Sequence, residues 1–221
     1  MKNLLCGLLV LSIGAHLLGC QGQVASTPKA ATTGKGESKG SEATVSKEDS
    51  APGSLEEHPE YGNWKQFGVG TIVRRKKTIS NDKETVTVTT QLRLVEKDEK
   101  HITVETQIDV ERSLSGKEVN PPFQVDFPAS FRLPPSVKME QFLLPSLKAK
   151  QVGEESVQIG NDLFDSLKFE WTEKNEAGPM SVKYWQSQRM PGRFVRQEQN
   201  TESLNTKSLE EVIEVKLVKD P

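Results

Sequence analysis

The stretches KETVTVTTQLRLVE (residues 83–96) and KHITVETQIDVER (residues 100–112) decide the fold class. In both, polar residues alternate with apolar residues at even positions, namely Val86, Val88, Leu92, Leu94, Ile102, Val104, Ile108 and Val110. A period of two over this length, with many β-branched residues, is typical of antiparallel strands that bury one face. The charged residues 96–100 between the two stretches then form a hairpin loop.

Similar alternation extends on both sides of this hairpin. Residues 67–79 predict a preceding strand that turns at 80–82, and later strands are expected at 154–160, 164–173, 179–188, 192–200 and 210–219. In the last of these, Ile213, Val215 and Leu217 are in step. Prolines interrupt the middle of the chain between 120 and 145, so we expect a loop there with a short helical turn.

These patterns predict a mostly β domain over residues 57–221. We expect a single antiparallel meander of about eight strands, forming an open barrel or a curved sheet. No long amphipathic helix is available to cover the apolar side of such a sheet. The sheet must therefore curl, pair with the proline-rich middle or accept an apolar guest.

The N-terminus has the features of an export signal. Residues 1–20 read MKNLLCGLLVLSIGAHLLGC, in which Lys2 precedes a 15-residue run, Leu4–Leu18, that holds no acidic or basic residue other than His16. A spanning helix needs about 20 apolar residues, so this run is too short to cross a membrane.

The end of that signal, Leu17-Leu18-Gly19-Cys20, resembles the lipobox of bacterial lipoproteins. The resemblance implies that residues 1–19 are a signal peptide, that cleavage precedes Cys20, and that its thiol carries a diacylglycerol while its amine is acylated, commonly with palmitate. Gln21 stands where the family's inner-membrane retention signal has Asp. The resemblance thus implies an exported, lipid-anchored envelope protein, at the outer membrane and facing the periplasm if the cell has one.

Residues 20–56 are expected to be a disordered tether. The segment is rich in Ser, Thr, Gly, Ala, Lys and Glu, has no aromatic residue, and shows no hydrophobic period. Such a composition cannot bury enough apolar area to offset the entropy of ordering the chain. About 35 flexible residues give a root-mean-square reach of about 30–35 Å.

Composition and motifs argue against several functional classes. The chain is 34% hydrophobic with a net charge of −2, which offers no basic footprint for nucleic acid. It has no G-x-S-x-G motif, and after the signal only His58 and His101 remain as histidines. Two histidines without a free thiol do not form a zinc set, and no calcium loop is present. We therefore expect no catalytic residues, no metal site and no cofactor.

Two features remain as candidate contacts. Arg74, Arg75, Lys76 and Lys77 could meet anionic head groups or an acidic polymer; alternatively, they protect a sheet edge from pairing. Tyr184 and Trp185 are adjacent on a predicted strand, so one of them is expected outside the core or lining a groove.

The segment WQSQRMPGRFVR (185–196) resembles a strand–Pro-Gly–strand hairpin of uncharacterised β-rich bacterial lipoproteins, which implies a fold and no activity. A looser analogy, by topology alone, is to the curled sheets of envelope lipoprotein carriers. Our leading hypothesis is a lipid-anchored, non-enzymatic module that binds an envelope protein, polymer or lipid, or maintains envelope structure. The alternative is a carrier of a lipid or acyl chain in a curled sheet, and an envelope hydrolase is third.

The lipid anchor gives the first testable prediction. Cys20→Ser should abolish the incorporation of a radioactive fatty acid in growing cells, because only a thiol accepts the diacylglycerol in this family. Equal labelling of the wild type and the variant would contradict the lipoprotein assignment.

Overall fold

The computed structural model describes residues 53–220. The predicted signal peptide, Cys20 and nearly all of the predicted tether lie outside the described residues. Strand β1 begins at Ser54, three residues before the predicted domain boundary at 57. No helix among residues 53–220 is long and apolar enough to cross a membrane.

The described residues form twelve strands, two short α-helices and one 3₁₀ turn. The helices are α1 (Pro59–Trp64) and α2 (Met139–Leu143), and the 3₁₀ turn is Glu202–Leu204. The strands are β1 (Ser54–Glu57), β2 (Ile72–Ser80), β3 (Thr85–Lys97), β4 (His101–Arg112), β5 (Gly116–Val119), β6 (Phe123–Pro128), β7 (Ser130–Leu133), β8 (Lys150–Ile159), β9 (Asp162–Asn175), β10 (Gly178–Gln186), β11 (Phe194–Thr201) and β12 (Thr206–Lys216).

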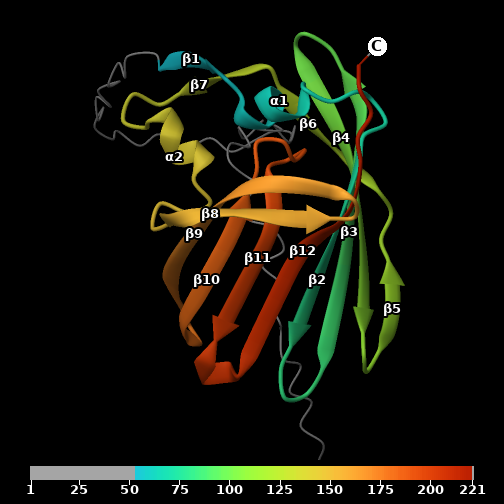
Figure 1. Cartoon of the computed structure of the whole chain (residues 1–221), viewed down its shortest axis with the longest axis vertical. Coiled ribbons are helices and arrows are strands. Elements are labelled where there is room, and N and C mark those ends of the chain that lie inside the picture. Colours follow the sequence, from blue (N-terminus) through green and yellow to red (C-terminus); the bar gives the residue numbers. More distant parts are fainter. Residues whose placement is uncertain (1–52, 221) are drawn as a thin grey trace, which may run out of the picture. The chain divides into compact units, whose positions relative to one another are not determined.

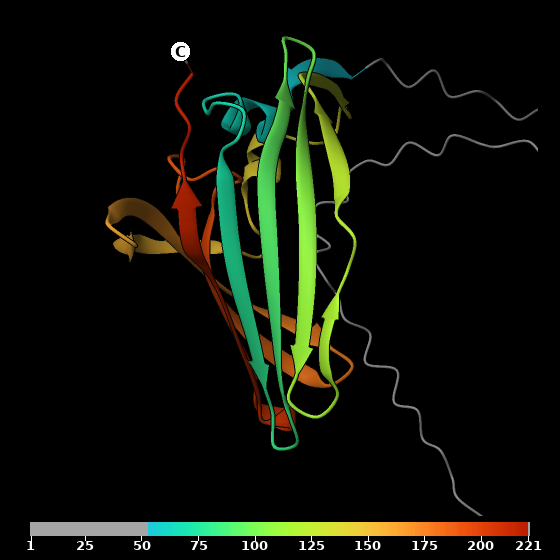
Figure 2. The same ribbon diagram turned by 90° about the vertical axis from the view of Figure 1, so that its right-hand side faces the viewer.

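Ten of these strands make one antiparallel sheet in the order β5-β4-β3-β2-β12-β11-β10-β9-β8, with β6 beside β4 (Figure 1). Strands β1 and β7 pair separately. The sheet is curved and open, so that β2–β4 and β9–β11 form two wings that meet at β12 (Figure 2). The predicted fold class is confirmed. The single meander is instead two runs of hairpins, β2–β6 and β8–β12, joined where β12 pairs with β2.

The proline-rich middle contains more strand than we predicted. Besides the expected helical turn, α2, it forms β6 and β7. Strand β6 tolerates proline because Pro128 is its last residue, opposite His101, and because β6 pairs with β4 alone. These short strands, together with β1 and β5, raise the number of strands above the expected eight.

The register confirms the predicted alternation in β3 and β4. Val88 lies opposite Val110, and Leu94 lies opposite Val104, and all four side chains are buried. Paired residues share a face, which we call the inner face; it is the concave side of the sheet (Figure 2). At one end of this face, α1 packs Trp64 into the main core, which includes Tyr61, Val73, Leu94, Ile102, Val104, Phe127, Phe194 and Val212.

The predicted face of the last strand is confirmed for Val215, which packs against the main core, and is wrong for Ile213 and Leu217. A β-bulge between Val212 and Glu214 places an extra residue in β12, which reverses the alternation at that point. Val212 is therefore buried, whereas Ile213 is 45% exposed. Leu217 lies beyond the end of the strand and is 44% exposed.

The β8–β9 hairpin folds back across the outer face of the sheet, in front of β10–β12 in Figure 1, so that β8 contacts β12. Its turn is the predicted Gly160-Asn161 pair, in which Gly160 has a φ of 60°. The register puts Trp185 opposite Lys168 and Arg196, on the face that Tyr184 does not occupy. Trp185 is nevertheless only 4% exposed. We predicted that only one of the two adjacent residues would be covered. Both are covered, because the β8–β9 hairpin packs over the outer face of this part of the sheet.

The assignment of faces predicts a contrast between two neighbours in β3. Leu94 is fully buried, so Leu94→Gln should lose about 2 kcal/mol of apolar burial and leave an amide without partners, for a total of about 3–5 kcal/mol. Arg93 is exposed, and Arg93→Gln should change the free energy of unfolding by less than about 0.5 kcal/mol. Urea denaturation of both variants measures the contrast. Equal destabilisation would mean that β3 is covered on both faces.

Candidate functional site

Helix α1 fastens the turn between β10 and β11 to the end of the sheet. His58 caps the helix, since its Nδ1 accepts the Glu60 N–H at 3.2 Å, and Pro59 follows at the first turn. The Asn63 amide donates to the Gln188 carbonyl at 3.2 Å and accepts the Gly192 N–H at 2.6 Å. The single side chain of Asn63 therefore bonds the backbone on both sides of the predicted Pro191-Gly192 turn.

Arg193, next in this turn, has a φ of 58°, a conformation that costs energy for a residue with a side chain. Its guanidinium makes a largely buried ion pair with Glu60 on α1, at 2.6 Å. The ion pair and the Asn63 contacts together hold the turn in place. Sequence reasoning did not find Asn63, Glu60 or Arg193, because each acts through partners about 130 positions away.

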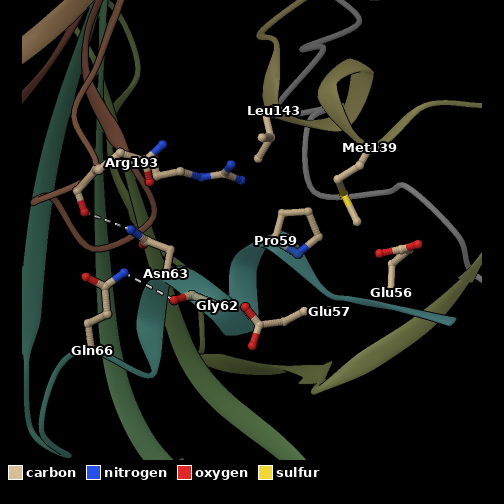
Figure 3. Close-up of a pocket in the computed structure, with 10 residues that line it drawn as sticks. Glu56, Glu57, Pro59, Gly62, Asn63, Gln66, Met139, Leu143 and Arg193 are labelled. Atoms are coloured by element: carbon tan, nitrogen blue, oxygen red, sulfur yellow. Dashed lines mark hydrogen bonds between the residues drawn. The ribbon is translucent and has the colours of Figure 1, made fainter.

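A pocket of about 380 Å³ opens beside α1 (Figure 3). It is lined by Glu56, Glu57, Pro59, Gly62, Asn63, Gln66, Met139, Leu143, Gln188 and Arg193. Two of its three charged residues form ion pairs, because Arg193 pairs with Glu60 and Glu57 pairs with Lys65. The lining contains no serine, cysteine, threonine or histidine, so no hydroxyl or thiol lies beside a histidine base there.

The basic cluster on β2 is divided between the two faces of the sheet. Arg74 lies outside and pairs with Glu214 at 3.1 Å, whereas Lys77 lies inside, 3.9 Å from Glu210. Strand β2 pairs on both sides, with β3 and with β12, so the edge-protection alternative is wrong. The sequence did contain a signal for this pairing, because residues 74–77 are basic and residues 210–214 include three glutamates.

Beyond the main core, the inner face carries two further groups of apolar side chains. The β2–β4 cluster consists of Val86, Val88 and Val110 with Ile79 and Ile108 against them. The β9–β10 cluster consists of Phe169, Trp171 and Val182 with Ala149, Leu167, Met180 and Tyr184 against them. These clusters lie on opposite wings of the curved sheet, and the two do not merge into one core.

Arg75 lies between these clusters on the inner face. Its register partners are Thr90 on β3 and Val212 on β12. Its guanidinium carbon stacks 4.5 Å from the ring centre of Phe194. The Arg75 Nε is buried and has no hydrogen-bond partner within the described residues. Arg75 thus places a positive charge on the inner face, with a buried donor that no described residue satisfies.

The two predicted groove aromatics are not brought together. On the inner face, burial raises the pKa of Tyr184 to about 12, although the charge of Arg75 opposes the shift, so the phenol stays protonated at neutral pH. On the outer face, the Trp185 indole donates to Glu155 at 2.9 Å, with Lys168 and Arg196 each 5.3 Å from its ring. Tyr184 therefore lies on the same face as Arg75, close enough to feel its charge, whereas Trp185 fastens the β8–β9 hairpin through Glu155.

A third group of side chains lies at the β3–β4 hairpin, where Glu96, Asp98 and His101 place potential metal-ligand atoms within 4.8 Å of one another. The Asp98 carboxylate already accepts the backbone N–H groups of His101 and Lys100, which lower its pKa. These hydrogen bonds explain why the three side chains lie together, since they stabilise the turn of the β3–β4 hairpin.

No protein-family model and no curated protein matches the sequence. Among solved structures, a Bacteroides fragilis protein described as exported, with a YmcC-like fold, is 10% identical over 68% of this chain and 97% of its own, with a TM-score of 0.40. A Parabacteroides distasonis protein described as a lipoprotein is 13% identical over 67% of this chain and 96% of its own, with a TM-score of 0.39. A Vibrio parahaemolyticus domain described as outer membrane lipoprotein-sorting is 9% identical over 72% and 88%, with a TM-score of 0.25. Similarity this low transfers no function.

The cap of α1 predicts a pH dependence. Burial lowers the pKa of His58 from 6.5, although the Glu60 carboxylate partly opposes the shift. The stability contributed by neutral His58 is complete above the unfolded-state pKa and is lost as the pH falls through the lowered folded-state value. His58→Asn keeps a capping acceptor that does not titrate, so it should flatten the free energy of unfolding between pH about 7 and 5. A variant that keeps the wild-type slope would contradict this role.

Proposed function

We propose that this protein is a lipid-anchored cell-envelope protein that binds an anionic amphiphile, such as a fatty acid or an acidic lipid, on the inner face of its sheet. One observation supports the proposal most directly. The buried, unpartnered Nε of Arg75 lies between two separate apolar clusters on a concave surface. Of the hypotheses drawn from the sequence, this arrangement favours the carrier over a purely structural module.

The chemistry of the inner face suits an acyl chain with a negative head. Each buried methylene contributes about 0.8 kcal/mol, so a long chain lying along either cluster gains several kcal/mol before the cost of ordering it. A carboxylate or phosphate would complete the hydrogen bonding of Arg75. The neighbouring cation, Lys77, is held by Glu210 and would contribute less.

Two further parts of the proposal rest on the sequence. The lipobox resemblance supports the anchor at Cys20 and a site of action in the envelope. A non-enzymatic role is supported by the sequence, which has no G-x-S-x-G motif and, after residue 20, only His58 and His101 as histidines.

Two adjacent arginines on opposite faces provide the test. Residues 20–221 with Cys20→Ser should bind the fluorescent fatty acid cis-parinaric acid. Arg75→Gln should weaken that binding about tenfold or more, because a hydrogen bond to a charged group contributes about 1.5–3 kcal/mol. The matched control, Arg74→Gln, removes an exposed arginine on the outer face and should leave the dissociation constant unchanged. The measurement is the rise in parinaric acid emission on titration.

Either of two results would contradict the proposal. One is the absence of saturable binding by the parent chain. The other is an equal loss of affinity in Arg74→Gln and Arg75→Gln, because the ligand would then not contact the inner face.

A further inference from the structure

The segment that follows β7 presents apolar side chains to solvent. Phe142, Leu143, Leu144 and Leu147 are 36%, 38%, 37% and 75% exposed, on and just after α2. The segment is held to the fold by the ring of Phe142, which meets Phe131 of β7 at 5.4 Å. Four large apolar side chains exposed within six sequence positions indicate a contact with another body.

The charges within residues 138–150 are mostly positive, whereas Glu56 and Glu57 line the adjacent pocket with Met139 and Leu143. Lys138, Lys148 and Lys150 flank the apolar residues, and all three are exposed and form no ion pair within the described residues. Glu140 is the only acidic residue from 138 to 150. Apolar side chains flanked in sequence by unpaired lysines are complementary to a bilayer surface with anionic head groups.

The chain outside the described residues enters the domain at the same place. Strand β1 starts at Ser54 and pairs with β7, so that Ser54 lies opposite Leu133. Helix α2 follows β7 directly, and the three elements lie together at one end of the fold (Figure 1). The predicted anchor at Cys20 is therefore joined to the domain beside the exposed apolar residues.

We propose that residues 138–150 form a membrane-contact segment that docks on an anionic bilayer. Leu143, Leu144 and Leu147 enter the interface, Phe142 holds the segment to β7, and the three lysines contact head groups. Docking would hold the domain at the membrane by a contact separate from the N-terminal lipid, and it would set the orientation of the inner face. The docking side chains belong to neither inner-face cluster, although Ala149 of the same segment packs against the β9–β10 cluster. The proposal shares with the proposed function only the envelope location.

A dye at Leu147 tests the contact without the lipid anchor. In residues 20–221 with Cys20→Ser no cysteine remains, so Leu147→Cys can be labelled alone with an environment-sensitive dye. Vesicles that contain phosphatidylglycerol should raise and blue-shift its emission, and vesicles of phosphatidylcholine alone should do so much less. Leu114→Cys is the matched control, since Leu114 is also 75% exposed but lies in the β4–β5 turn.

The lysines give a second, independent readout. Each lysine near an anionic surface contributes about fivefold in partitioning, so Lys148→Gln with Lys150→Gln should lower vesicle binding by between about fivefold and twenty-five-fold. Lys83→Gln, in the exposed β2–β3 turn, should leave it unchanged.

Several outcomes would overturn the membrane-contact segment. One is that the dye at residue 147 does not respond to anionic vesicles, and another is that the dye at residue 114 responds equally. A third is that the emission at residue 147 changes with protein concentration in the absence of vesicles, because the segment would then contact a second copy of the chain. Arg75→Gln separates this proposal from the fatty acid site: it should weaken the binding of parinaric acid about tenfold or more while vesicle binding persists.

Discussion

The pairing of β12 with β2 is the constraint on which the rest of the structure depends. It joins two runs of hairpins, far apart in sequence, into one sheet, with register pairs from Lys207–Ser80 to Lys216–Ile72. Opposite charges support this register on both faces, through Arg74–Glu214 outside and Lys77–Glu210 inside. Each such pair contributes only about 0.2–1 kcal/mol, but a shift by one residue would lose both and reverse every side chain in the ladder.

Joining the wings in this way produces a concave face that the described helices cannot cover. Helix α1 covers one end of it, where the main core forms, and the hydrogen bonds and ion pair around Arg193 fix that end. Further along, the apolar residues lie in two separate clusters on either wing. The β8–β9 hairpin covers part of the opposite face through Trp185. The binding capacity that we propose for Arg75 and its surroundings rests on the separation of these two clusters on the concave face.

The alternation of polar and apolar residues correctly predicted which face of a strand is buried where only one face is covered. The alternation in β3 and β4 identified buried Leu94 and Val104, because each strand there buries one face. The bulge at Ile213 and the covered Trp185 were not predictable, since both depend on what distant strands place against them. The basic cluster at 74–77 was found, but its partners were not, because charge complementarity between two segments does not specify that they pair. The division between Arg75 inside and Arg74 outside needed the register.

The central claim is that the inner face receives the acyl chain, and photo-crosslinking tests it most directly. A fatty acid with a diazirine near the end of its chain would be bound to residues 20–221 with Cys20→Ser, irradiated, and its attachment sites mapped by mass spectrometry. Attachment to inner-face residues of the two clusters, such as Val88, Val110, Trp171 or Val182, is the predicted result. Attachment confined to the outer face or to residues 138–150 would contradict it.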